Sequence, residues 1–466
     1  MTKAKPKQPQ SAICDSCIKL GDTIELDIND LGSNGEGIGH YENYTVFLPQ
    51  ALPKERVLAR VEHIKKSLIF ASLIKTITSS AQRVRPICPL FGRCGGCDIM
   101  HLEYSAQLDY KQSTLINILK KNANYTGEVD KVAPSKPLYY RNKIQLPFGI
   151  QSGKVVLGFF KAGTHNVVPL TKCYLHADWA DKLIGMVLGF ANSTAQTVYN
   201  EKSGKGLLRH LTARYIDNKL SVTLVINGDG VDGIELLSNQ LQRTFPSVTL
   251  SLSVNKKQNN IVMGDKLIEV LKGEQTLSIG GVALALNPLS FFQVNDEIRD
   301  KIYTQIIEII QPNPNTIFID CYAGVGLLGA LLAKSGVQTY NIEIIPEAVQ
   351  DANALYAKNN LTATNINGDA AEALPKLLAS ENLYLDGKQI IIFLDPPRKG
   401  LSPELTATLN TLPLHKDLTL IYLSCNPKTL SRDIAALSSY HPTAITPYDM
   451  FPQTKHVETV VLMTRL

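Results

Sequence analysis

TIFIDCYAGVGLLG, residues 316–329, is the stretch that decides the fold of the C-terminal part of the chain. Its first residues are mostly apolar and end at Asp320, and Gly324, Gly326 and Gly329 follow. Glycines directly after a strand let the backbone turn tightly and approach a ligand at the start of a helix. The stretch therefore predicts a strand, a loop that can hold a ligand and a helix. A dinucleotide-binding domain fits the same glycine spacing, and a tight turn without a ligand is the simplest alternative.

Asp320 favours S-adenosylmethionine (SAM) over a dinucleotide, whereas Glu343 is compatible with both ligands. Asp320 ends the first predicted strand, and an acid at that place is typical of loops that bind SAM. Glu343 ends the next strand, 339–343, at the position where a carboxylate binds ribose hydroxyls.

Polar residues also follow the later strands of this region. Asp369 comes after the third strand, Asp395 after the fourth and Cys425 after the fifth. Taken alone, Asp369 is best explained as a turn or helix-capping residue, whereas Asp395 precedes two prolines that fix it in an extended geometry. Apolar strands that alternate with helices predict a parallel sheet covered on both faces, and ligands bind beyond the carboxyl ends of its strands. We therefore expect an α/β Rossmann-like domain over 286–466.

The N-terminal part of the chain has the pattern of a small β-barrel. Polar and apolar residues alternate between Gly and Asn/Asp turns over 20–78, and short strands at this spacing are typical of barrels. Four strands are expected, with a glycine-rich connection at 32–39 between the first two. Basic residues outnumber acidic ones from Lys54 to Arg85. Such a run is most often a solvated face, although it also suits a nucleic-acid partner.

Cysteines form a second candidate site. Three lie close together with the spacing C-x5-C-x2-C and a fourth lies far downstream, namely Cys88, Cys94, Cys97 and Cys173. Four thiolates suit either an iron–sulfur cluster or a structural zinc ion, and the spacing does not choose between them. Cys14 and Cys17 form a separate pair, which we interpret as incidental thiols in a flexible tail, with a second small metal site as the alternative.

Length and composition predict several domains. The chain has 466 residues, of which 44% are hydrophobic, and a formal net charge of +5. It has neither the long apolar stretch of a membrane helix nor the apolar core of a secretory signal, so we expect a cytoplasmic protein without disulfides that is a monomer. We divide it into a flexible tail (1–17), the barrel (18–78), an α+β central domain (79–285) with a helix near 103–122 that could pack on the last domain, and the C-terminal domain (286–466).

Several motifs resemble those of the RNA uracil-C5 methyltransferases. They are DPPRKG (395–400), LSCNP (423–427), HVE (456–458) and FFQVN (291–295). The resemblance covers nearly the whole chain, and the barrel resembles the OB-like TRAM domain of the branch that modifies 23S ribosomal RNA. This resemblance implies a multidomain SAM-dependent methyltransferase that acts on RNA, and it favours a [4Fe-4S] cluster on the four cysteines.

The resemblance also implies a role for each candidate residue. Cys425 would add to C6 of uracil as a covalent nucleophile, which makes C5 able to attack the methyl group of SAM. Glu458 would take the proton from C5 as general base, and Asp395 would orient the uracil. A buried, inert thiol and an ordinary surface carboxylate are the alternatives for Cys425 and Glu458. The residues expected to bind SAM are Gln293, Tyr322, Gly324, Glu343, Asp369 and Asp395.

The substrate and the activity have alternatives. The segments 141–143 and 208–210 resemble parts of the central domain that recur in the family and could contact RNA, with internal ion pairs or solvated surface as the alternative. The same chemistry on transfer RNA is the main rival. We expect members acting on tRNA to lack barrel and cluster, so 23S ribosomal RNA is preferred. Arg398 and Cys425 argue against methylation of an amino group. The intact pair Cys425 and Glu458 argues against an inactive RNA-binding scaffold.

Overall fold

The computed structural model describes residues 18–288, 290, 292–380, 388–412 and 418–465. The chain divides into two compact units, one that ends at Arg85 and one that begins at Pro86. The first unit holds a closed barrel, and the second holds two seven-stranded sheets and a two-stranded hairpin. Among the described residues, none of the helices combines the length and the apolar character that crossing a membrane requires.

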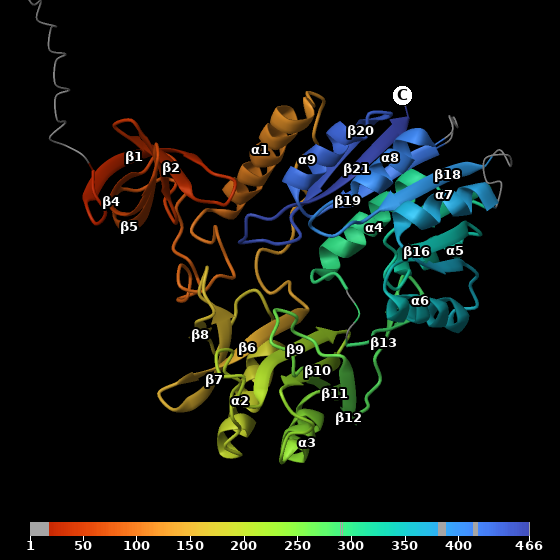
Figure 1. The fold of residues 1–466 in the computed structure, drawn as a ribbon, viewed down its shortest axis with the longest axis horizontal. Coiled ribbons are helices and arrows are strands. Elements are labelled where there is room, and N and C mark those ends of the chain that lie inside the picture. Colours follow the sequence, from red (N-terminus) through yellow and green to blue (C-terminus); the bar gives the residue numbers. More distant parts are fainter. Residues whose placement is uncertain (1–17, 289, 291, 381–387, 413–417, 466) are drawn as a thin grey trace, which may run out of the picture. The chain divides into compact units, whose positions relative to one another are not determined.

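The barrel has five strands in the order β1-β2-β3-β5-β4 (Figure 1). Its strands are β1 (Thr23–Leu31), β2 (Gly37–Tyr41), β3 (Tyr44–Leu48), β4 (Arg56–Lys65) and β5 (Leu68–Thr78). The prediction of four strands is therefore wrong by one, because part of the glycine-rich connection pairs with both neighbours as β2. A Cβ atom at Gly39 would lie 2.5 Å from the carbonyl oxygen of Asp27, so glycine allows a close approach that a side chain would block.

Two arginines of the basic run are used inside the barrel unit. Arg83 donates from Nε and Nη2 to the carboxylate of Glu55, at 2.5 and 2.7 Å, and the Glu55 side chain is fully buried. Arg56 pairs with Glu25 at 2.5 Å. The lysines of the run, from Lys54 to Lys75, are exposed. The positive charge that faces solvent is therefore smaller than the sequence count indicates.

The central part of the second unit is a mixed sheet in the order β12-β11-β10-β9-β6-β7-β8. Apolar residues on one face of the sheet pack against two helices and form a continuous core. The strands are β6 (Lys143–Gln151), β7 (Lys154–Phe160), β8 (Val167–Pro169), β9 (Leu208–Ile216), β10 (Lys219–Ile226), β11 (Ser247–Val254) and β12 (Lys266–Leu271), and the helices are α2 (Asp178–Ser193) and α3 (Ile234–Thr244).

The C-terminal part is a doubly covered sheet in the order β17-β16-β15-β18-β19-β21-β20, as the sequence predicted. Five strands are parallel, and β21 runs antiparallel to β19. The strands are β15 (Thr316–Asp320), β16 (Gln338–Glu343), β17 (Thr364–Asn367), β18 (Gln389–Leu394), β19 (Leu418–Ser424), β20 (Tyr440–Tyr448) and β21 (Glu458–Arg465). Alternate residues of the central strands belong to two different apolar cores, which places helices on both faces (Figure 1).

Helices α4 (Asp296–Ile310), α5 (Leu327–Ala333), α6 (Pro346–Lys358), α7 (Ala370–Ser380), α8 (Pro403–Thr411) and α9 (Pro427–Ala436) accompany this sheet. An additional helix, α1 (Tyr104–Ala123), also packs on it, because Leu115 and Leu119 belong to the same core as Leu430 of α9. The hairpin of β13 (Thr276–Ile279) and β14 (Val282–Ala285) shares a core with α5 and α6. Segments that precede the C-terminal domain in sequence thus help to build it.

Candidate active site at the strand ends

Four of the predicted residues lie at the carboxyl ends of neighbouring parallel strands. Asp320 and Glu343 end β15 and β16, while Asp395 and Cys425 directly follow β18 and β19. Parallel pairing brings these ends to one edge of the sheet. Glu458 joins them from the opposite direction, because it begins the antiparallel strand β21 beside the end of β19. A residue distant in sequence thus reaches the same edge.

The loop after β15 has the shape of a ligand-binding turn. Gly324 and Gly326 have φ angles of +53° and +72°, which favour glycine. The carboxylate of Glu343 accepts hydrogen bonds from the backbone N–H groups of Gly324 and Ile345, both at 2.9 Å. Asp320 is buried and accepts from the N–H of Tyr322 at 3.0 Å. Two acids therefore fix the loop that the sequence singled out.

The Asp320 carboxyl has an unusual environment for an acid. Burial, together with the nearby carboxyls of Asp395 and Glu343, raises its pKa to about 8, against the hydrogen bond from Tyr322. Burial also raises the pKa of Asp395 to about 7, although part of its surface remains exposed. The strand edge is thus rich in carboxyl groups that hold protons near neutral pH.

Asp369 and Gln293 are placed differently from the residues just described. The carboxylate of Asp369 accepts from the N–H of Ala371 at 2.8 Å and caps the start of α7. It also raises the pKa of Tyr322, together with burial, which places it in electrostatic range of that ring. The backbone carbonyl of Gln293 accepts from the side chain of Asn142 at 3.0 Å. Asp369 therefore has a structural role whether or not it meets a ligand.

Cys425 shares its surroundings with Glu458, Asp395 and Arg398. Burial, together with Glu458 and Asp395, raises the pKa of the Cys425 thiol to about 11, against the lowering effect of Arg398. Burial raises the pKa of Glu458 well above its usual range, with Asp395 acting in the same direction and Arg398 against it. One thiol, two carboxyls and one guanidinium thus act on one another at the strand edge.

Arg398 is the residue of this group that sequence reasoning did not assign to the site. Its Nη2 lies 3.4 Å from Nε2 of His456, two residues before Glu458. Its carbonyl oxygen accepts from Asn426 and Thr429, at 3.2 and 3.3 Å, which ties it to the segment after Cys425. Its position in the DPPRKG motif is the signal that could have identified it.

The four predicted metal ligands line one cavity. Cys88, Cys94, Cys97 and Cys173 all border it, together with Arg141 and apolar side chains. Burial raises the pKa of Cys94 and, to about 11, that of Cys173, and the other thiols contribute in the same direction. Within the described ranges, however, no group of His, Cys, Asp or Glu has the arrangement of a formed metal site. The thiols share a cavity without being drawn together, and Cys14 and Cys17 lie outside the described residues.

The two basic segments proposed for RNA contact are mostly engaged inside the protein. Arg209 donates to the carbonyl oxygens of Asn255 and Lys257, at 2.7 and 2.8 Å, and lies 4.2 Å from the ring centre of Tyr199. Arg141 lies over the ring of Phe451 at 5.8 Å. Both arginines therefore have contacts inside the protein.

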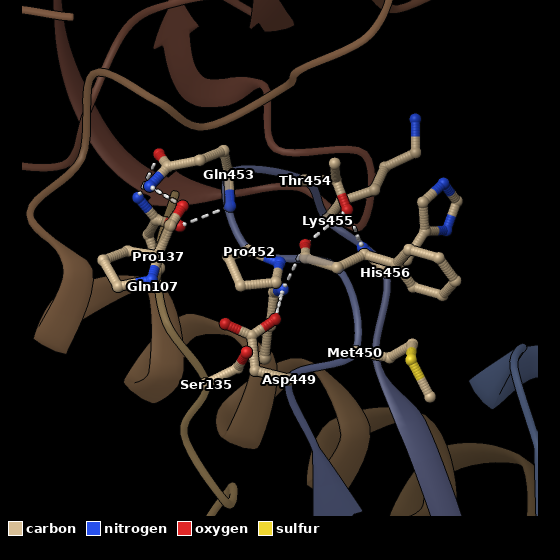
Figure 2. Close-up of polar contacts among 12 residues, drawn as sticks. Gln107, Ser135, Pro137, Asp449, Met450, Pro452, Gln453, Thr454, Lys455 and His456 are labelled. Carbon is tan, nitrogen blue, oxygen red and sulfur yellow. Dashed lines mark hydrogen bonds and ion pairs between the residues drawn. The ribbon is translucent and has the colours of Figure 1, made fainter. Parts of the chain in front are cut away.

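A loop that leads to Glu458 is fixed by many polar contacts (Figure 2). It runs from Asp449 to His456, between β20 and β21. Gln107 of α1 donates from Nε2 to Oε1 of Gln453 at 3.0 Å, and the backbone N–H of Gln453 donates to Oε1 of Gln107, also at 3.0 Å. Lys111 and Asp449 form an ion pair at 2.5 Å with both side chains fully buried. Helix α1, which is far from this loop in sequence, thus holds the loop at two places.

Comparison with known proteins agrees with this architecture. Residues 103–466 match the tRNA (Uracil-5-)-methyltransferase family, and residues 19–74 match the TRAM domain. An uncharacterized RNA methyltransferase of Halalkalibacterium halodurans is 33% identical over 456 residues, which cover 96% of this chain and 98% of that protein. Another uncharacterized RNA methyltransferase, from Clostridium acetobutylicum, is 32% identical over 465 residues, with 96% and 98% covered.

A solved structure is similar over almost the entire length. The tRNA (uracil-54, C5)-methyltransferase of Pyrococcus abyssi, in complex with S-adenosyl-L-homocysteine, has a TM-score of 0.75 and 26% identity. The match covers 94% of this chain and 99% of that one. The unmatched part of this chain is too short to contain the whole barrel, so most of the barrel is matched as well. The expectation that members acting on tRNA lack the barrel is therefore wrong. The chain belongs to the tRNA (uracil-5-)-methyltransferase family and is a SAM-dependent RNA uracil-C5 methyltransferase.

Proposed function

We propose that this enzyme methylates C5 of a uridine in 23S ribosomal RNA through a covalent adduct between the sulfur of Cys425 and C6 of the base. The chemistry is carried by one observation, the gathering of a thiol, two carboxyls and a guanidinium around the ends of β18 and β19. A nucleophile beside a carboxyl base is the set of groups that addition to a uracil and removal of its C5 proton require.

Cys425 acts in the first step. Its sulfur donates an electron pair to C6, and the pair of the C5–C6 double bond moves toward C5 and O4. Because burial and Glu458 raise the pKa of Cys425 to about 11, the thiol keeps its proton in the free enzyme. Arg398 lowers this pKa and so favours the thiolate form that attacks.

Glu458 acts in the last step. SAM, when bound, supplies an electrophilic methyl group for C5. Once Glu458 is ionised, a form that Arg398 favours, its carboxylate takes the proton from C5, the C–H electron pair restores the C5–C6 double bond, and the C6–S pair returns to Cys425. The sulfur carries no charge while it is bonded to C6, so it does not oppose the ionisation of Glu458 at this stage.

The remaining strand-end residues would hold the two substrates. We assign the ribose of SAM to Glu343, whose carboxylate already bonds the glycine loop, with Tyr322, Gly324, Gln293 and Asp369 as further contacts. Asp395 would orient the uracil edge, because its carboxyl lies in electrostatic range of both Cys425 and Glu458.

We further propose that Cys88, Cys94, Cys97 and Cys173 bind a [4Fe-4S] cluster. Their shared cavity and their mutual effect on each other's pKa support a common ligand. Four thiolates are also suitable for zinc. A cluster would offset the cost of burying thiolates by coordinating them to metal, and it would join the loops that carry the four cysteines.

The four-cysteine cavity is the feature that still favours 23S ribosomal RNA, since the barrel no longer distinguishes the two substrates. Transfer RNA is the second candidate substrate. The full-length similarity to the Pyrococcus abyssi enzyme, whose name gives tRNA uracil-54 as its target, favours it. The deciding experiment maps 5-methyluridine in ribosomal and transfer RNA from cells with and without the gene. Loss of a modified uridine from 23S RNA alone supports our proposal, whereas loss from tRNA alone replaces it with the second candidate.

A further inference from the structure

The cysteine loop touches the loop that carries the general base. Asp98 directly follows Cys97 and, like it, lies on the segment that borders the cysteine cavity. The N–H groups of Asp98 and Ile99 both donate to the carbonyl oxygen of Gln453, at 3.0 and 3.1 Å. The carboxylate of Asp98 accepts from the backbone N–H of Lys455 at 3.2 Å and lies 3.4 Å from its Nζ.

These contacts lie very near the catalytic group. Lys455 is three residues before Glu458, and His456 between them contacts Arg398 at 3.4 Å. The charge of Asp98 raises the pKa of His456, against the stronger lowering by burial and Arg398, so that Asp98 is in electrostatic range of this histidine. A displacement of Asp98 would therefore move the backbone at Lys455, which leads directly to Glu458.

Other contacts hold other parts of the same loop, so the contribution of the Asp98 side chain is specific to the segment next to His456. Gln107 and Lys111 of α1 fix Gln453 and Asp449. Tyr140, beside the cavity-lining Arg141, donates its hydroxyl to the carbonyl oxygen of Pro452 at 3.1 Å. The α1 contacts lie at the start and middle of the loop, and Asp98 contacts Lys455 near its end, next to His456.

We infer that Asp98 is a positioning residue for Glu458 and couples the cysteine loop to the removal of the C5 proton. The inference rests on the proposed role of Glu458 as general base. In this step Glu458 takes the proton from C5 while the bond between C6 and Cys425 breaks. A base displaced from C5 slows that step, but it leaves SAM binding and the earlier addition of sulfur to C6 unaffected.

The test compares Asp98→Ala, Asp98→Asn and Glu458→Gln with wild type in single-turnover reactions with target RNA and SAM. Asp98→Ala should accumulate a methylated protein–RNA adduct on denaturing gels several-fold above wild type, with kcat about tenfold lower and an unchanged SAM Kd. Asn can still accept from the Lys455 N–H, so Asp98→Asn should restore most of the turnover. Asp109→Ala, an exposed carboxylate on α1, is the matched control and should behave as wild type.

Thermal stability, metal content, adduct formation and SAM affinity together separate the possible outcomes. Thermal melting and the metal content of each variant show whether the cysteine site is intact. If Glu458→Gln accumulates adduct but an intact Asp98→Ala releases product like wild type, the positioning role is disproved and the base assignment stands. If Glu458→Gln itself gives no adduct, the proposed base and the inference that rests on it both fall. A higher SAM Kd and loss of metal in Asp98→Ala, without adduct, would also overturn the inference, because it indicates a purely structural role.

Discussion

The strand-end site and the cysteine cavity are built in opposite ways. Asp320, Glu343, Asp395 and Cys425 each stand at or just beyond the end of a strand whose register is fixed by its neighbours. Cys88, Cys94, Cys97 and Cys173 stand in loops outside the helices and strands. Groups placed by a sheet keep their positions without a ligand, whereas groups placed by loops depend on something that joins them. This contrast agrees with our proposals of a catalytic role for the first site and a cross-linking metal ligand for the second.

The largest effect on methylation is expected from a substitution of the thiol at the strand-end site. Cys425→Ala should lower methylation by on the order of 10⁴-fold or more, because the base is not activated without the sulfur. The SAM Kd and the melting temperature should stay close to wild type, since the strand keeps its register. Calorimetric SAM titration and transfer of labelled methyl groups measure both quantities. Methylation near the wild-type rate would disprove the covalent mechanism.

A change at the cysteine cavity should have the opposite signature. Cys173→Ser, purified without oxygen, should lose most of its iron and melt several degrees lower, because the loops lose their common ligand. The wild-type protein should be brown and contain roughly equal iron and sulfide. Metal analysis and thermal melting decide this prediction. A colourless wild-type protein that holds one zinc ion would reverse the cluster assignment.

The strand-end placement of the first site also explains how much of it could be predicted from the sequence. A polar residue after an apolar run is visible in the sequence, so the ends of β15, β16, β18 and β19 could be predicted from it. Glu458 could be assigned only by resemblance, because an antiparallel strand brings it to the edge from the end of the chain. Contacts such as Lys111 with Asp449 have no local pattern at all. Strand β2 was missed because glycine usually marks a turn, and here it permits close strand packing.

The rate at which 5-fluorouridine RNA traps Cys425 covalently should depend on pH. The pKa of Cys425 lies near 11, above its ordinary value, so the thiolate fraction rises with pH throughout the working range. Covalent trapping by 5-fluorouridine RNA should therefore accelerate by about tenfold per pH unit between pH 6 and 9. Quenched reactions on denaturing gels give the rate. A flat profile would show that RNA binding itself lowers this pKa, probed best by repeating the series with Arg398→Leu.

The smallest expected effect concerns the barrel, which contains none of the catalytic candidates. Removal of residues 1–85 should leave the SAM Kd unchanged and weaken RNA binding by about tenfold at physiological salt, with a shallower salt dependence, because exposed lysines no longer meet phosphates. The cut follows Arg85 and so removes Arg83 together with Glu55. Filter binding over a range of salt concentrations, after a check of folding by melting, measures the change. Unchanged affinity and slope would exclude the barrel from RNA binding.

Glu55 gives the barrel a property that matters for how such enzymes evolve. Its buried carboxylate accepts four hydrogen bonds, and every donor belongs to Leu52, Ser80 or Arg83. A buried charge whose partner lies in another domain would be left unpaired when the domains are separated, at a cost of several kcal/mol. Here the charge is satisfied within the barrel unit. The Glu55 charge would therefore stay paired if the chain were divided after Arg85, so this ion pair does not prevent the barrel from being gained, lost or exchanged as one module.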